Sequence, residues 1–210
     1  MASNYPALKL SYFDFSGGRG EPARIALHYA NIPFEDNRIP TSEWPERKAD
    51  FIFHQLPELE IDGQVLTQSN AINRYVGKLA GLYPEDLIQA ALCDAVMDNV
   101  DDAAQPVVNT FFMPEPEKRM IREDLVANLL PRFLSGLNQQ LIENGGLYFV
   151  EKRLTMADLK AYIWIKSLLN GHLDHIPTTI VGDHAPELLS HARHINSLLD
   201  HHQLNLKSTA

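Results

Sequence analysis

Short strand-like and helix-like patterns alternate in the first part of the chain. Apolar and polar residues alternate over 8–15, which predicts a strand, and residues 34–39 form a second strand candidate. Between them, Pro22 suits the first turn of a helix over 21–30, because the N–H that proline lacks would be unpaired there. A strand, a helix and a strand within about 30 residues indicate a parallel crossover unit.

A hairpin and another helix follow. Asp62-Gly63 separates two short apolar runs, 59–61 and 65–67, and Asp-Gly is a favoured two-residue hairpin turn. We expect Ser69 to cap a helix that runs to about Leu79. The order of these elements predicts an α/β domain over residues 1–82.

After residues 81–84 the chain has no convincing strand pattern, and its apolar spacing predicts helices. Apolar periodicity predicts helices over 88–104, 117–143 and 186–199. Thr155 and Asp158 have the spacing of a capping box at the start of another helix, with Leu154 and Leu159 placed to form its hydrophobic staple. Residues 83–210 are therefore predicted to form an all-α domain.

Composition and charge exclude some classes of function. Of 210 residues, 45% are hydrophobic and 21% charged, which is typical of a globular chain. The net charge of −9 argues against binding to nucleic acid or to an anionic membrane. Cys93 is the single cysteine, so no intrachain disulfide can form, and we interpret it as a packing residue. Without a signal-peptide pattern or an 18-residue apolar run, we expect a soluble, cytoplasmic protein.

Several residues could carry chemistry. Tyr12 ends the first strand and Arg19 precedes the first helix, where ligands bind in open α/β sheets, although a rim tyrosine and a solvated arginine are equally ordinary interpretations. Ser69 is either a plain cap or, with the helix amides, a holder for a carboxylate. Asp98, Asp101 and Asp102 crowd one helical face, which must be solvated or matched by a cation, and a divalent metal is the less favoured alternative.

The order of these motifs resembles that of the cytosolic glutathione transferases over essentially the whole chain. The matching segments are 10–13, 18–21, 32–36, Trp44-Pro45 with Lys48, 55–57, 62–75 and 155–158. Tyr12-Phe13, Trp44-Pro45 and Asp101-Asp102 are most similar to the sigma class.

The resemblance implies a thioredoxin-like first domain that binds glutathione, a helical second domain that lines the site of a small hydrophobic electrophile, and a homodimer. Tyr12 would donate a hydrogen bond to the glutathione sulfur, and Arg19 would orient or polarise substrates. Glutathione would contact Tyr12, Trp44, Lys48, Gln55, Leu56, the cis-proline Pro57, Gln68, Ser69 and, across the dimer, Asp102. Phe13 and Phe15 would lie in the electrophile site. Glutathione is a co-substrate, and neither a cofactor nor a metal is implied.

Two departures from the family pattern stand out. The loop after Tyr12 is one residue longer and carries Gly17-Gly18, which would widen the mouth of the pocket or loosen Tyr12. His54 and Gln55 replace a common glycine and lysine near the glycine end of glutathione.

The favoured function is therefore a transferase that conjugates electrophiles, as in detoxification. The alternatives are a non-catalytic ligand carrier or crystallin-like relative, and a glutathione-dependent isomerase or peroxidase. Because folds are shared between functions, the choice depends on the site.

Overall fold

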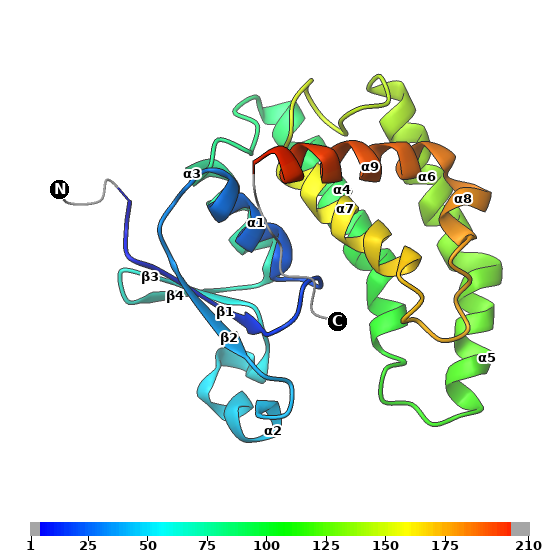
Figure 1. Cartoon of the computed structure of the whole chain (residues 1–210), viewed down its shortest axis with the longest axis horizontal. Coiled ribbons are helices and arrows are strands. Elements are labelled where there is room, and N and C mark those ends of the chain that lie inside the picture. The colour runs from blue at the N-terminus through cyan, green and yellow to red at the C-terminus, as the bar shows by residue number, and fades with distance from the viewer. Residues whose placement is uncertain (1–4, 203–210) are drawn as a thin grey trace. The chain divides into compact units, whose positions relative to one another are not determined.

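A computed structural model describes residues 5–202 of the chain. Its contacts divide into two compact units, Met1–Tyr83 with Leu199–Ala210, and Pro84–Leu198. The first is a thioredoxin-like α/β unit and the second is helical (Figure 1). In the described part of the chain, no helix combines the length and apolarity that a membrane crossing requires.

The first unit is built on a four-stranded mixed sheet in the order β2-β1-β3-β4. Its strands are β1 (Leu8–Phe13), β2 (Glu35–Ile39), β3 (Glu58–Ile61) and β4 (Gln64–Thr67). Strand β1 runs parallel to β2 and antiparallel to β3, so the predicted crossover and hairpin are both confirmed. Asp62 and Gly63 form the hairpin turn with φ of 48° and 86°, as an Asp-Gly turn requires.

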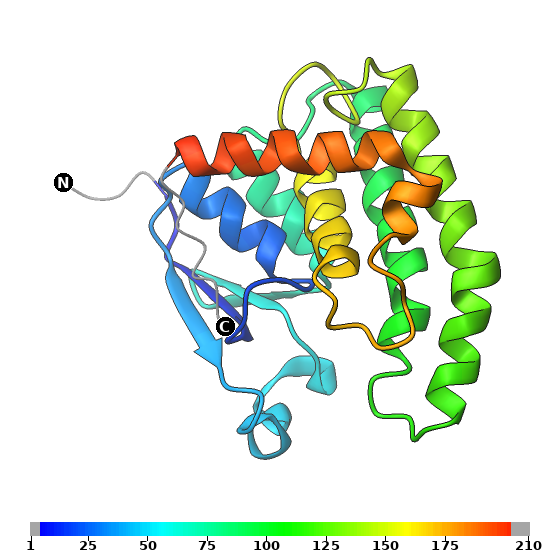
Figure 2. The same cartoon turned by 45° about the vertical axis from the view of Figure 1, so that its right-hand side comes forward.

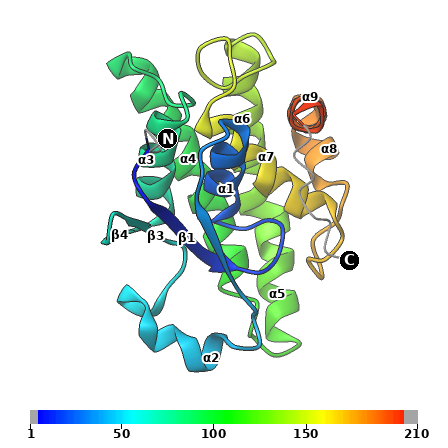
Figure 3. The same cartoon turned by 60° about the vertical axis from the view of Figure 1, so that its left-hand side comes forward.

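Helices lie on both sides of this sheet. Helices α1 (Glu21–Tyr29) and α3 (Ser69–Leu79) lie on one side, and α2 (Trp44–Arg47) lies on the other (Figure 3). Leu10 and Leu59, paired across β1 and β3, are fully buried. Two 3-10 turns, η1 (Lys48–Asp50) and η2 (Ile52–His54), continue from α2 towards β3.

The prediction for the start of α3 was wrong in one respect. Gln68, with φ 70°, is the N-cap residue, and Ser69 is the first residue of the helix. Side-chain capping by Ser69 is therefore excluded at this helix end, and the Ser69 hydroxyl belongs to the first helical turn instead.

The second unit consists of helices joined by loops (Figure 2). They are α4 (Leu87–Val108), α5 (Glu117–Asp124), the π-helical segment η3 (Leu125–Leu129), α6 (Leu130–Glu143), α7 (Met156–Leu169), α8 (Ile180–His184) and α9 (Pro186–His201). The long predicted helices are confirmed. The π segment, which divides the expected 117–143 helix, and the short α8 were not predicted.

The capping box of α7 is confirmed and extends further than predicted. The Asp158 carboxylate accepts hydrogen bonds from the Thr155 N–H and hydroxyl, both at 2.8 Å, and from the Phe149 N–H at 2.9 Å. His191 of α9 places Nε2 3.1 Å from the same carboxylate, and both side chains are fully buried. Asp158 therefore joins three segments of the second unit.

Candidate functional site

Tyr12 lies at the carboxyl end of β1, with 5% of its surface exposed. Its hydroxyl accepts a hydrogen bond of 2.8 Å from the Arg19 backbone N–H. Burial raises the pKa of Tyr12, and the Arg19 N–H and charge oppose that effect more weakly. The phenol therefore stays protonated around neutral pH and keeps a proton that it can donate.

The glycines of the loop hold Tyr12 rather than loosening it. A Cβ added at Gly18, where φ is +68°, would lie 2.4 Å from the Tyr12 hydroxyl oxygen. A Cβ at Gly20 would lie 2.4 Å from the Tyr12 ring. Two non-bonded heavy atoms cannot lie this close, so the loop backbone can approach Tyr12 in this way only with glycine at positions 18 and 20. The close packing at Gly18 does not fit the alternative in which the longer loop loosens Tyr12.

A small hollow in the first unit gathers six of the predicted residues. These are Arg19, Gln55, Leu56, Pro57, Gln68 and Ser69. The Leu56-Pro57 peptide bond is cis, as predicted. Ile52, Phe53 and Thr67 also line the hollow and were not predicted, because neither spacing nor charge marks them.

The backbone around the hollow is strained at three residues, and one end of the hollow is electropositive. Phe53, His54 and Gln68 have φ of 57°, 52° and 70°, a region that costs a residue other than glycine about 1–3 kcal/mol and persists where surrounding structure imposes it. The amino end of α3, which begins at Ser69, favours an anion because its first N–H groups lack helical partners. Arg19 adds a positive charge. A carboxylate is the ligand group that fits this end of the hollow.

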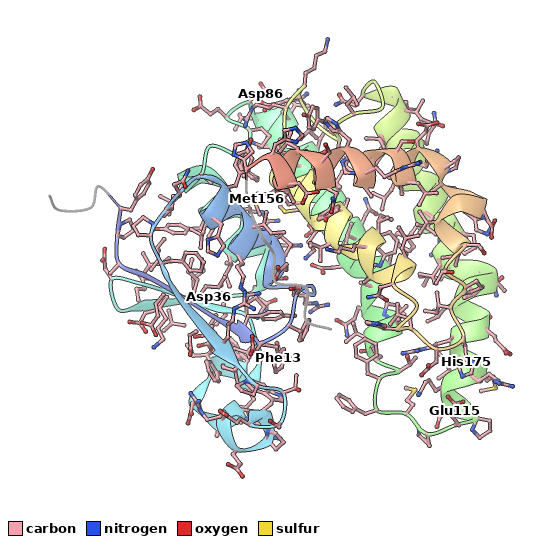
Figure 4. The ribbon with its side chains drawn as sticks, viewed as in Figure 1. Phe13, Asp36, Asp86, Glu115, Met156 and His175 are labelled. Atoms are coloured by element: carbon pink, nitrogen blue, oxygen red, sulfur yellow. The ribbon has the colours of Figure 1, made fainter. Side chains whose placement is uncertain are left out.

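Other predicted residues of the first unit lie outside that lining. Trp44 packs edge-on against Phe13, with ring centroids 5.2 Å apart, and 5.7 Å from Phe51. Phe15 lies 5.7 Å from Tyr12 and stacks on Phe13 at 6.0 Å. Figure 4 shows Phe13 at the end of β1, where this aromatic cluster begins. Lys48 is exposed.

The acidic face of α4 has a cationic partner. Asp101 forms an ion pair of 2.9 Å with Lys160 of α7, whose side chain is only 4% exposed. Asp98 and Asp102 are exposed. Within residues 5–202, no group of three or more His, Cys, Asp or Glu could hold a metal ion. Cys93 is buried, and burial raises the pKa of its thiol to about 12, which fits a packing role.

Comparisons with known proteins agree with the fold and the motifs. Residues 8–78 match the family model "Glutathione S-transferase, N-terminal domain", and residues 101–198 match the corresponding C-terminal domain model. Glutathione S-transferase 1 of Ascaris suum is 36% identical over 179 residues, which cover 80% of this chain and 86% of that protein. Hematopoietic prostaglandin D synthase of Gallus gallus is 33% identical over 190 residues, 88% of each chain. The structure of prostaglandin synthase D of Nilaparvata lugens is similar with a TM-score of 0.78 and 31% identity, covering 97% of this chain and 96% of that one.

Proposed function

Because the chain belongs to the glutathione S-transferase family, we propose that it binds glutathione in the hollow of its first unit and activates the thiol through Tyr12. The observation that carries the proposal is the Tyr12 hydroxyl, which is held by the Arg19 N–H at 2.8 Å and retains its own proton. A phenol fixed in this way can donate to a sulfur anion without reorganising.

The energies are sufficient for thiol activation. A free thiol has a pKa near 8.5, and lowering it by one unit requires about 1.4 kcal/mol of preference for the thiolate. A hydrogen bond to a charged group contributes about 1.5–3 kcal/mol, so the Tyr12 hydroxyl alone accounts for one to two units. Arg19 also lines the hollow and adds positive charge there. The thiolate then attacks an electrophilic carbon, and Tyr12 remains protonated throughout.

We propose that the remaining predicted residues contact the same bound glutathione or the electrophile. We assign the γ-glutamyl carboxylate to Gln68 and Ser69, at the amino end of α3, and the cysteinyl backbone to Leu56. Trp44, Lys48 and Gln55 would hold the glycine end. Phe13 and Phe15 would contact the electrophile.

A homodimer completes the proposal. The first unit exposes the apolar side chains of Ile52, Phe53 and Val65, by 47%, 71% and 40%. The second unit exposes Leu87, Ile88 and Leu92 on the first turns of α4, by 86%, 70% and 46%. Apolar side chains exposed to this degree favour burial against a second copy of the chain. Asp102, exposed on α4, would reach the γ-glutamyl ammonium of the partner's glutathione, as in the sigma class.

The Tyr12→Phe variant tests this function. We expect it to bind glutathione within about threefold of the wild type and to lose at least about 90% of its conjugating activity, since a hydrogen bond to a charged group is lost. Tyr5→Phe, a change at an exposed tyrosine of the same unit, is the matched control and should leave activity unchanged. Full activity in Tyr12→Phe would exclude the role assigned to Tyr12.

A second candidate reaction is a glutathione-dependent isomerisation. It is favoured by the prostaglandin D synthases among the relatives, at 33% identity in sequence and a TM-score of 0.78 in structure. Turnover of a prostaglandin endoperoxide with glutathione but without a conjugated product would support it. Glutathione binding with neither reaction would indicate a ligand carrier.

A further inference from the structure

The segment between β2 and β3 is weakly attached to the first unit. None of the residues in α2, η1 or η2 is buried, and Phe51 is the buried side chain between the two 3-10 turns. Contacts of Trp44 with Phe13 and Phe51 fix its amino-terminal half. Its carboxyl-terminal half carries the left-handed residues Phe53 and His54 and continues directly into the lining of the hollow. The contacts of Trp44 do not fix this carboxyl-terminal half, so another contact must hold it against the sheet.

A row of polar side chains crosses the sheet beneath this segment. Asn37, Ser11, Glu58 and Thr67 are successive cross-strand partners from β2 to β4. Paired residues point to the same face of a sheet, and Phe13, two residues after Ser11, points to that face and contacts Trp44 of α2. Glu58 is the charged member of the row and is only 8% exposed. A carboxylate in that position is costly unless it is hydrogen-bonded.

The Glu58 carboxylate binds the backbone of the segment. Its Oε1 accepts a hydrogen bond from the Ile52 N–H at 2.5 Å. That contact closes a ring from Ile52 to Glu58 that contains both left-handed residues and Gln55, Leu56 and Pro57. Burial raises the pKa of Glu58, and the hydrogen bond from the Ile52 N–H opposes that effect more weakly. A buried carboxylate whose hydrogen bond shapes a ligand-facing loop is characteristic of a functional position.

We propose that Glu58 is a positioning residue for glutathione: by binding the Ile52 N–H, it holds the 52–57 loop in the conformation that presents Leu56 to the cysteinyl part. This inference rests on the proposed function. It assigns to Glu58 the affinity for glutathione and not the activation of the thiol, because Tyr12 and Arg19 lie on β1 and on the loop that follows it.

The test compares four variants of the full chain. Glu58→Val removes the acceptor, and Glu58→Gln keeps an acceptor oxygen of the same reach. Ile52→Pro removes the donor at the first residue of a helical turn, where proline fits. Glu60→Gln removes the same charge at an exposed position of the same strand and is the matched control. Each is titrated with glutathione, and hydrogen exchange of the 48–56 amides is followed in its absence.

We expect Glu58→Val and Ile52→Pro each to raise the dissociation constant for glutathione about tenfold, the effect of one hydrogen bond. Exchange over 48–56 should accelerate in both, while the pKa of the bound thiol stays at the wild-type value. Glu58→Gln should recover most of the affinity, and Glu60→Gln should behave as wild type. If Glu58→Val is too unstable to study, the expected result for Ile52→Pro still stands.

Wild-type affinity in Glu58→Val or Ile52→Pro would overturn the proposal. So would an equal loss in Glu60→Gln, or a change in the pKa of the bound thiol. Failure of the wild-type protein to bind glutathione would instead contradict the proposed function, and the exchange data would still report whether Glu58 orders the loop.

Discussion

At the scale of single residues, the most informative feature is how closely the loop after β1 surrounds one hydroxyl. Gly18 and Gly20 leave no room for a Cβ beside Tyr12, and the Arg19 N–H between them donates to its oxygen. The backbone, rather than a second side chain, therefore fixes the direction of the phenol. A longer loop can serve this purpose because glycine permits both the positive φ and the close approach.

Gly18→Ala tests this arrangement. The new methyl group would lie 2.4 Å from the hydroxyl oxygen, in a backbone conformation that alanine disfavours. We expect kcat/KM for conjugation to fall at least about tenfold, since the hydrogen bond to the sulfur is displaced. Gly17→Ala is the control, because its φ is also positive but its Cβ would meet no atom within 4 Å. Equal activities in the two variants would contradict the account of Gly18.

The residue scale also shows what the sequence could and could not predict. The resemblance implied the cis peptide bond before Pro57, which the structure has. Arg19, Pro57 and Gln68 line one hollow, and the Arg19 N–H donates to Tyr12. The roles of these residues stay predictions. Glu58 was not predicted. A glutamate in a strand that alternates with apolar residues is ordinarily exposed, and only the fold shows that the 41–56 segment covers it.

At the scale of elements, one buried carboxylate connects several segments of the second unit. The Asp158 carboxylate accepts hydrogen bonds from the Thr155 and Phe149 N–H groups and contacts Nε2 of His191, and its side chain is fully buried. The capping box was predictable because it is local in sequence. The contribution of His191, 33 residues away, could not be read from spacing.

Asp158→Ala should therefore destabilise the second unit more than the loss of an ordinary cap. Removing the carboxylate leaves several buried donors unpaired, and we expect a loss of about 3 kcal/mol or more. For a chain of this size that lowers Tm by roughly 6–12 °C. Asp183→Ala, at an exposed aspartate in α8, should change Tm by less than about 2 °C. Both variants are measured by calorimetry. A fall in Tm for Asp158→Ala as small as that for Asp183→Ala would contradict the role given to the Asp158 carboxylate.

Glu58 should make the stability of the folded protein depend on pH. Its pKa is raised in the folded protein, so the folded state binds the proton more tightly than the unfolded state. Stability attributable to Glu58 is therefore greatest at acid pH and falls as pH rises through the raised folded pKa. We expect Glu58→Gln to exceed the wild type in Tm at pH 7 and the difference to shrink as pH falls towards 4. A difference that is constant or grows on acidification would be inconsistent with a buried, ionised Glu58.

The short elements were the least predictable. Helix α2 has four residues and α8 five, which is too few for a hydrophobic period to appear. The π-helical segment interrupts an otherwise correctly predicted helix just before Pro131. Proline lacks the N–H that a regular α-helical turn would use, so the chain has a local reason to depart from the α pattern there.

At the scale of the whole molecule, two neighbouring aspartates of α4 have different surroundings. Asp101 is already paired with Lys160, so it stabilises the second unit, whereas its neighbour Asp102 is exposed. Asp101 therefore has a structural partner, and Asp102, which the resemblance singles out, stays a candidate ligand.

Asp102→Ala should weaken glutathione binding about five- to tenfold, as expected when a charged ligand group loses a hydrogen-bonded partner. The loss should occur although the hollow of the first unit is unchanged. Asp98→Ala removes the same charge from an exposed position on the same helix and should leave affinity unaltered. Equal binding by the wild type and Asp102→Ala, measured by calorimetric titration, would remove Asp102 from the site.

The most direct test of the central claim is a glutathione titration from pH 5 to 9 that follows thiolate absorbance in the ultraviolet. The account predicts that bound glutathione ionises one to two units below the pKa of about 8.5 of a free thiol, and that this shift disappears in Tyr12→Phe. Because burial raises the pKa of Tyr12, the phenol itself does not ionise in that range. Glutathione that binds with an unshifted thiol, or a shift that survives in Tyr12→Phe, would contradict the account.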